Sequence, residues 1–153
     1  MLELIIGPMY AGKTTTLLSR KQGRTLIITH VNDTRAAGVR THDGVHAVAM
    51  KCSTLPTGLD CDTVLIDEAQ FFDSLDGVEH LAPKVVVAGL NGDYRRRPFG
   101  KILDLIPIAD KITFQTARCK CGQRAAFTKR ISDETDTVCV GAHYEPTCGQ
   151  CWL

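Results

Sequence analysis

The eight residues from Gly7 to Thr14 constrain the fold of this chain most strongly. They read Gly-Pro-Met-Tyr-Ala-Gly-Lys-Thr and fit the pattern G-x-x-x-x-G-K-S/T, directly after a strand-like run and before a helix-like one. Such a loop points backbone N–H groups at phosphate oxygens, while Lys13 adds a positive charge and Thr14 an oxygen ligand for Mg²⁺. The alternative is a glycine turn with a surface lysine, which the flanking pattern disfavours. We therefore predict a phosphate-binding loop made by Gly7, Pro8, Met9, Tyr10, Ala11, Gly12, Lys13 and Thr14.

Short apolar runs rich in β-branched residues indicate the sheet to which this loop belongs. They do not alternate with polar residues and lie at 2–6, 25–29, 63–66 and 85–88. Strands buried on both faces of a parallel sheet have this composition. Helices are expected at 13–22, 71–82 and 102–108, and one more strand at 111–117. The pattern predicts an α/β fold with a parallel sheet flanked by helices.

Two acidic residues follow the strand-like run at 63–66. Asp67 and Glu68 end an apolar strand in the form of a Walker B element, in which an aspartate holds Mg²⁺. Glu68 is our candidate general base, because it is free of the metal and can accept a proton. Acidic residues also favour helix N-termini, which is the alternative explanation. Since ligands bind at the carboxyl ends of parallel strands, we expect this pair to meet the phosphate loop.

Two close pairs of cysteines mark the C-terminal part of the chain. Cys119 and Cys121 form one pair, and Cys148 and Cys151 form the other. Four thiolates suit a closed, structural zinc site, although the C-x-C spacing is tighter than usual. We predict a P-loop core at 1–117 and a small, zinc-ribbon-like lobe at 118–153. Cys52, Cys61 and Cys139 are expected to be free thiols.

Charge and hydropathy narrow the classes of protein to which the chain can belong. The formal net charge is +1, so no overall positive charge attracts nucleic acid or an anionic membrane. The apolar runs are too short for a membrane span, and the first residues lack the features of a leader peptide. We therefore expect a cytoplasmic protein with neither nucleic acid nor membrane as its partner.

Taken with these motifs, the chain resembles the type II thymidine kinases over nearly its whole length. The runs that carry the resemblance are LIIGPMYAGKT (4–14), NDTR (32–35), THD (41–43), DEAQFF (67–72), RPFG (97–100) and TKR (128–130). The resemblance implies transfer of a phosphoryl group from ATP, with Mg²⁺, to the 5′-hydroxyl of thymidine and of deoxyuridine. It also implies structural zinc and a homotetramer.

The resemblance also assigns roles to individual residues. Glu68 matches the general base of the family, and Asp33, Thr34, Arg35, Asp67 and Gln70 match positions of the nucleotide site. A lasso loop at about 132–144 would close over the base. The acceptor pocket would be lined by Met9, Phe71, Leu90, Tyr94, Phe99, Val138, Cys139, Val140, Gly141 and Tyr144.

Two other classes of protein share some of these motifs. One is an ATPase or GTPase with a zinc ribbon that binds nucleic acid, and it would hydrolyse nucleotide without a nucleoside. The other is a non-catalytic nucleotide-binding module, which the presence of Lys13, Thr14, Asp67 and Glu68 together disfavours.

Overall fold

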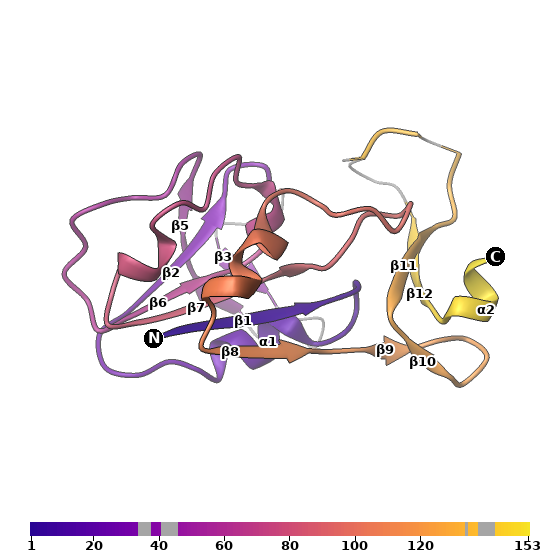
Figure 1. Ribbon diagram of the computed structural model, residues 1–153, viewed down its shortest axis with the longest axis horizontal. Coiled ribbons are helices and arrows are strands. Elements are labelled where there is room, and N and C mark those ends of the chain that lie inside the picture. Colours follow the sequence, from indigo (N-terminus) through magenta and orange to yellow (C-terminus); the bar gives the residue numbers. More distant parts are fainter. Residues whose placement is uncertain (34–37, 41–45, 134, 138–142) are drawn as a thin grey trace.

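The computed structural model describes residues 1–33, 38–40, 46–133, 135–137 and 143–153. Figure 1 shows an elongated molecule with a large core at one end and a small C-terminal lobe at the other. The core is a six-stranded, wholly parallel sheet in the order β5-β2-β6-β7-β1-β8. Its strands are β1 (Leu2–Gly7), β2 (Thr25–His30), β5 (Met50–Cys52), β6 (Thr63–Ile66), β7 (Lys84–Leu90) and β8 (Lys111–Phe114). The predicted α/β fold with a parallel sheet is confirmed.

The central strands are buried on both faces, as their unbroken apolar runs predict. On one face, Ile5 and Leu65 pack against Leu17 of α1 (Lys13–Leu18). On the other face, Leu4 and its neighbours pack against a fully buried Phe72 and the 3₁₀ helices. Burying one such side chain contributes roughly 1.5–3 kcal/mol. The loop after β1 therefore starts from a rigid base.

Two of the three predicted helices differ from the structure, one in length and one in existence. The expected helix at 13–22 ends at Leu18, and the next turns form hydrogen bonds between residues three apart, such as Arg20 N–H to the Leu17 carbonyl. The predicted helix at 71–82 is wrong: the region holds only the 3₁₀ helices η1 (Ala69–Phe71) and η2 (Val78–His80), because Gly77 adopts a left-handed φ of 74°. The helix at 102–108 forms as the 3₁₀ helix η3 (Ile102–Ile108). Within the described part of the chain, no helix is long and apolar enough to span a bilayer.

Three short strands lie between β2 and β6 that we do not expect from the sequence. β3 (Gly38–Arg40) and β4 (His46–Val48) form an antiparallel pair, and β5 adds an edge strand to the main sheet. β5 contains Lys51 between Met50 and Cys52, so it lacks the apolar run that identifies the other sheet strands.

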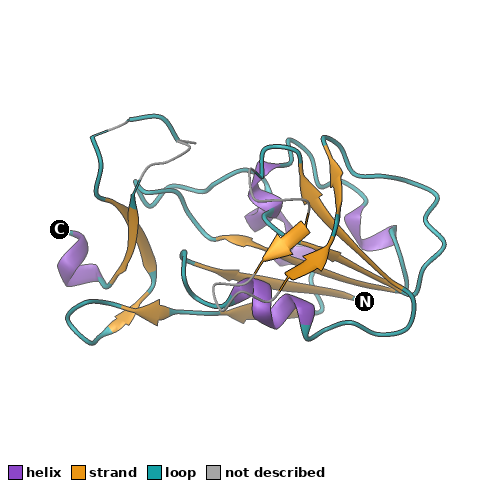
Figure 2. Ribbon diagram, turned by 180° about the vertical axis from the view of Figure 1, so that it is seen from behind, coloured by secondary structure: helices purple, strands orange, loops and turns teal. Residues whose placement is uncertain are grey.

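The C-terminal lobe consists of two small antiparallel ribbons and one helical turn (Figure 2). These elements are β9 (Ala117–Arg118), β10 (Arg124–Ala125), β11 (Phe127–Arg130), β12 (Tyr144–Thr147) and α2 (Gly149–Trp152). The strand expected at 111–117 is thus divided between β8 in the core and β9 in the lobe. Ala125, Cys119 and Cys148 form a small buried cluster there. So few buried residues supply little stability, which suits a lobe held by another kind of cross-link.

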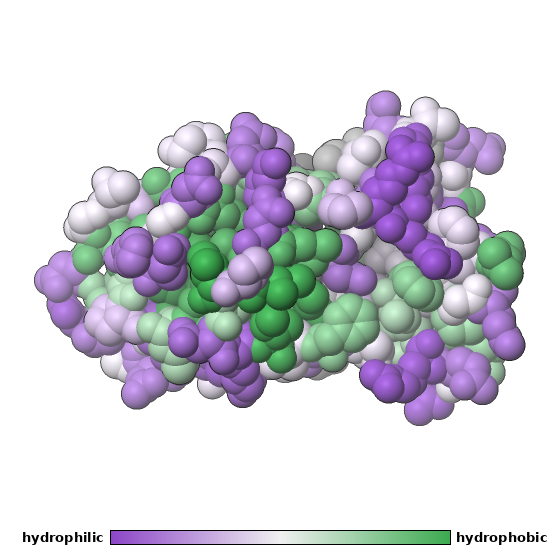
Figure 3. All heavy atoms as spheres, viewed as in Figure 1, coloured by the Kyte–Doolittle hydropathy of each residue, from purple (hydrophilic) through white to green (hydrophobic). Residues whose placement is uncertain are grey.

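Apolar side chains also gather on the outer face of the core. Figure 3 shows them on the face of the molecule over η3 and toward β8. The exposed members are Ile106, Ile108, Ile112 and Phe114, each between 42% and 48% exposed. An apolar patch of this kind often marks a protein–protein contact.

Candidate functional site

The loop after β1 turns sharply into α1, and its glycines make that turn. Gly12 has a left-handed φ of 81°, and Tyr10 also has a positive φ, of 64°. At Gly7 an added Cβ would collide with the Gln115 carbonyl oxygen, so no larger residue fits there. The loop therefore has the tight backbone expected of a phosphate cradle at the carboxyl edge of the sheet.

The phosphate loop and the acidic pair meet through Thr14 and Asp67. The Thr14 hydroxyl donates a hydrogen bond of 2.9 Å to Asp67 Oδ2, across 53 residues of sequence. Lys13 lies in the same loop, and its ammonium group donates to the Pro8 carbonyl at 2.6 Å. The expected meeting of the two motifs is confirmed. A hydroxyl and a carboxylate side by side are also the hard oxygen donors that Mg²⁺ prefers.

Glu68 follows Asp67 and has an unusual backbone conformation. Its φ is 52°, in the left-handed region that glycine favours. The side chain is half-buried, and its Oε2 accepts a 2.5 Å hydrogen bond from the Gln70 amide. Gln70 in turn accepts from the Leu90 backbone N–H at 3.1 Å. The carboxylate of Glu68 is thus oriented by an amide that is itself tied to β7.

Aromatic rings lie next to this acidic pair. Phe71 and Phe99 meet edge to face, with ring centroids 5.9 Å apart. His30, at the end of β2, lies 6.2 Å from the Phe71 ring and 4.9 Å from that of Phe72. The Phe71 backbone also donates to the Glu68 carbonyl. The structure therefore brings two of the predicted acceptor-pocket residues together beside the candidate base.

The C-terminal lobe reaches the phosphate loop through β11. The Met9 backbone N–H donates to the Thr128 hydroxyl at 3.0 Å, and Thr128 is buried. Our assignment of site residues does not include Thr128, although it stands in the TKR run that supports the resemblance. Tyr144 is the first residue of β12 and lies opposite Arg130 of β11. Its hydroxyl accepts a 2.7 Å hydrogen bond from Arg130.

Asp33 lies three residues after the end of β2. Its carboxylate accepts a 2.9 Å hydrogen bond from the Thr29 hydroxyl, and its carbonyl accepts from Lys51 at 2.8 Å. Tyr94 lies in the loop after β7, and six other predicted site residues lie outside the described part of the chain. They are Thr34, Arg35, Val138, Cys139, Val140 and Gly141.

The four paired cysteines converge in the lobe. The sulfur atoms of Cys119, Cys121, Cys148 and Cys151 all lie within 4.8 Å of one another, and those of Cys121 and Cys148 are 3.6 Å apart. Tetrahedral zinc with Zn–S bonds of about 2.3 Å separates its sulfur ligands by about 3.8 Å. The spacing of these thiols therefore fits a metal ion, and the C-x-C pair contributes both of its sulfurs.

The protonation of these thiols also suits a cation. Backbone N–H groups of Cys121 and Cys148 lower the pKa of Cys119 to about 6. The neighbouring sulfurs of Cys121, Cys119 and Cys148 raise the pKa of Cys151 to about 12. The pKa of Cys148 is lowered as well, mainly by the backbone N–H of Cys151. The cluster thus favours thiolate at Cys119 and Cys148 and opposes it at Cys151, and a bound cation would favour the deprotonated form of all its ligands.

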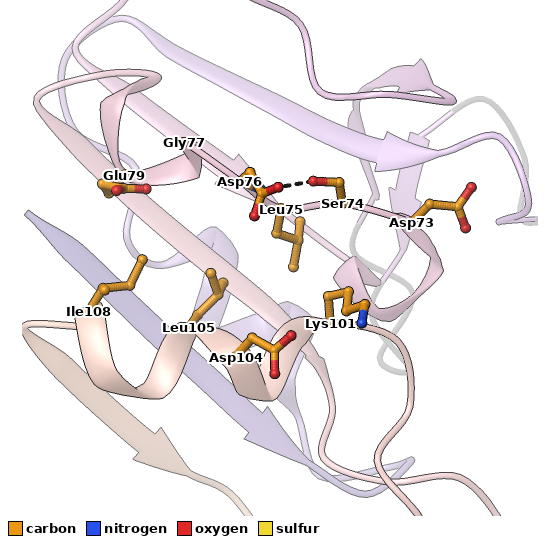
Figure 4. A pocket seen from close by; sticks show the side chains of 10 residues that line it. All are labelled: Asp73, Ser74, Leu75, Asp76, Gly77, Glu79, Lys101, Asp104, Leu105 and Ile108. Atoms are coloured by element: carbon orange, nitrogen blue, oxygen red, sulfur yellow. Dashed lines mark hydrogen bonds between the residues drawn. The ribbon is translucent and has the colours of Figure 1, made fainter.

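A separate cavity of about 430 Å³ lies between the 73–79 segment and η3. Figure 4 shows Asp73 and Lys101 at one end, Glu79 and Ile108 at the other, and Leu105 from η3 between them. None of the predicted site residues lines this cavity. It is distinct from the site formed by the phosphate loop.

The similarity to a known protein family extends over all the residues of this site. The family described as thymidine kinase matches residues 1–152. The chain belongs to the thymidine kinase family. Its place there agrees with the resemblance that the phosphate loop, the acidic pair and the cysteines indicate.

Individual relatives extend over almost the full chain. A thymidine kinase from Oryza sativa subsp. japonica is 41% identical across 99% of this chain and 66% of its own length. One from Monkeypox virus is 36% identical across 99% of this chain and 96% of its own. Thymidine kinase a of Arabidopsis thaliana is 41% identical across 95% of this chain and 72% of its own. The chain therefore spans almost all of the viral member of the family and about two thirds of the rice member.

Proposed function

We propose that this chain is a thymidine kinase, which transfers the terminal phosphoryl group of ATP to the 5′-hydroxyl of thymidine and of deoxyuridine. The observation that carries the proposal is the contact between Thr14 and Asp67. It unites a phosphate loop with a carboxylate pair in one site. The family and the names of its relatives support the choice of thymidine as acceptor.

In this proposal ATP lies along the loop from Gly7 to Thr14. Its backbone N–H groups and the Lys13 ammonium would offset charge on the phosphate oxygens, which matters most as charge spreads in the transition state. Thr14 and Asp67 would hold Mg²⁺, which would supply positive charge to offset that of the phosphates. Asp33, Thr34, Arg35 and Gln70 would complete the nucleotide site, with Arg35 as the arginine that offsets phosphoryl charge.

Glu68 would act as the general base. It would accept the proton of the 5′-hydroxyl as the oxygen attacks phosphorus. The hydrogen bond from Gln70 supports this role, because it holds the carboxylate in one orientation. The nucleoside base would lie among Met9, Phe71, Leu90, Tyr94, Phe99 and Tyr144, with Val138, Cys139, Val140 and Gly141 of the lasso loop closing over it.

The organisation of the protein is part of the same proposal. Residues 1–117 would form the kinase core and 118–153 the lobe, in which the four clustered cysteines would hold structural zinc. The protein would work in the cytoplasm as a homotetramer, with neither nucleic acid nor a membrane as partner. The exposed apolar patch on η3 and β8 supports contact with another subunit.

The decisive test is a panel of nucleosides incubated with the protein, ATP and Mg²⁺, and analysed for nucleoside monophosphates. We expect thymidine and deoxyuridine monophosphate, and ATP consumption that depends on the nucleoside. ATP hydrolysis without a nucleoside, stimulated by DNA or RNA, would instead indicate the ATPase class. Metal analysis of the same sample should find about one zinc per chain.

A further inference from the structure

Arg130 joins the two flanks of the loop that follows β11. It is the last residue of β11, is 8% exposed, and lies opposite Tyr144 in the register of the β11–β12 ribbon. Its Nη2 donates to the Tyr144 hydroxyl at 2.7 Å and to the Thr137 carbonyl at 3.2 Å. Thr137 precedes the predicted base-facing residues and Tyr144 follows them. One guanidinium group therefore links both ends of this segment.

The same guanidinium also contacts the kinase core. Its central carbon lies 3.8 Å from the centre of the Tyr94 ring, and 5.2 Å from the centre of the Tyr144 ring. Tyr94 belongs to the loop after β7, and its hydroxyl donates to the Thr135 carbonyl at 2.5 Å. Arg95 donates to that carbonyl as well, at 2.6 Å. Arg130 thus lies where the core and the base of the lasso loop meet.

On the core side, this contact is made by the turn at 93–97, which is held by hydrogen bonds to Asp93. Asp93 is 8% exposed, and its Oδ1 accepts from the backbone N–H groups of Arg95 and Arg97 at 2.9 and 3.0 Å. Arg96 contacts two rings of the lobe. The central carbon of its guanidinium lies 4.3 Å from the centre of the Phe127 ring and 4.8 Å from that of the Trp152 ring. The turn at 93–97 therefore contacts the lobe at two places and presents Tyr94 to Arg130 in a fixed orientation.

We propose that Arg130 is a positioning residue of the acceptor site, which sets Tyr94 and Tyr144 relative to each other and anchors the lasso loop. The proposal rests on the proposed function, because those two tyrosines are assigned to the nucleoside pocket. Arg130 contacts Tyr94, Tyr144 and Thr137, so we expect it to act through these neighbours on the acceptor side of the site. Its loss should therefore weaken nucleoside binding and leave ATP binding intact.

The test is steady-state kinetics of R130M and R130K with each substrate varied in turn. We expect R130M to raise KM for thymidine by about tenfold or more, because a stacked and hydrogen-bonded cation is lost. KM for ATP and kcat of R130M should both stay within about threefold of the values of the parent protein. The KM of R130K for thymidine should lie between those of R130M and the parent protein, because lysine keeps the charge but lacks the planar guanidinium that reaches two acceptors.

Two further variants make the result specific. R124M removes an exposed arginine from the neighbouring strand β10 and should leave both KM values unchanged. In a Y94L background, R130M should add much less than it does alone, because the stacking partner is already gone. Equal KM values for R130M and the parent would overturn the proposal. So would a parallel rise in both KM values together with lost zinc or a lower melting temperature, which would show a purely structural role.

Hydrogen exchange separates this proposal from the proposed function. R130M should speed exchange of backbone amides in peptides covering 131–144 and leave peptides covering 1–20 unchanged. This measurement needs no nucleoside. A parent protein inactive on thymidine would refute the proposed function, while unchanged exchange at 131–144 in R130M would refute the anchoring role.

Discussion

Gln70 ties the Glu68 carboxylate to the sheet: its amide nitrogen donates to Glu68 Oε2 at 2.5 Å, and its amide oxygen accepts from the Leu90 N–H at 3.1 Å. The Glu68 side chain is thereby oriented without being sealed from solvent. This arrangement suits a base that must accept a proton from a bound hydroxyl.

Replacing Glu68 by Gln should abolish most turnover while leaving binding almost unchanged. The amide keeps the size of the side chain but cannot accept the proton, so kcat should fall on the order of 10²- to 10⁴-fold. The dissociation constants of ATP and thymidine, measured by calorimetry, should change by no more than a few fold. D76N, at an exposed aspartate, is the control and should keep full activity. Equal kcat in E68Q and the parent would rule out Glu68 as the base.

Thr14→Val should show the effect of the Thr14 hydroxyl on activity, because the shape of the side chain is kept. Valine keeps the branched form but loses the oxygen that bonds Asp67 and that would hold Mg²⁺. We expect kcat/KM to fall on the order of 10²-fold, with T14S retaining most activity. T15V makes the same change at the next, exposed position and should be nearly neutral. If T14V and T15V had equal kcat/KM, the hydroxyl would have no role in the reaction.

Gly100→Ala should reveal how closely the backbone approaches Gln70. Gly100 has a φ of 65°, and an added Cβ would collide with the Gln70 carbonyl. Gly58 has a φ of 67° with open space around it, so G58A carries the conformational cost alone. Urea unfolding should give a loss of about 1 kcal/mol for G58A and about 2 kcal/mol or more for G100A. G100A should also lower kcat by displacing Gln70. Equal losses of unfolding free energy in G100A and G58A would contradict a close contact between Gly100 and Gln70.

Cys121→Ser should remove zinc and destabilise the lobe. Cys121 is the exposed member of the four-thiol cluster, so its loss exposes little new apolar surface. We expect bound zinc to fall well below one per chain and the melting temperature to drop by several degrees, on the order expected when a structural metal is lost. C61S, at a cysteine outside the cluster, should keep its zinc. Full zinc content in C121S, measured by mass spectrometry, would exclude a four-cysteine site.

Glu3→Gln should lower stability without touching the site. The Glu3 side chain is 3% exposed and is paired with Arg20 at 3.0 Å and Lys111 at 3.7 Å. Leaving both cations without their carboxylate should cost about 1–3 kcal/mol of unfolding free energy. The control is D60N, which breaks an exposed pair with Arg24 and should leave the free energy of unfolding almost unchanged. Similar unfolding curves for the two variants would contradict a stabilising role for the buried pair.

The sequence predicts the sheet well because the sheet is buried on both faces. The buried residues of a strand such as β7 must then all be apolar, and the unbroken apolar run at 85–88 is easy to recognise. β5 lacks this signal, since it lies at an edge and contains Lys51. The prediction of a helix at 71–82 is wrong for another reason. The apolar residues of this segment cover the sheet from two separate turns, and the left-handed backbone of Gly77 separates the two turns.

The site is predictable where its chemistry depends on residue type and spacing. The phosphate loop, the acidic pair and the four cysteines are found this way, and the structure brings each set together. The contacts between the lobe and the core are not predicted, because neither Thr128 nor Arg130 stands in a motif whose spacing indicates a partner. Their roles depend on how the lobe folds back on the core.

The left-handed backbone at Glu68 has a consequence for how the protein can be engineered. A residue with a side chain costs about 1 kcal/mol more than glycine in that conformation. Selection for heat resistance alone should therefore enrich glycine or asparagine at position 68. With Glu68 as the proposed general base, such variants would lose turnover, so stability and catalysis favour different residues at this position.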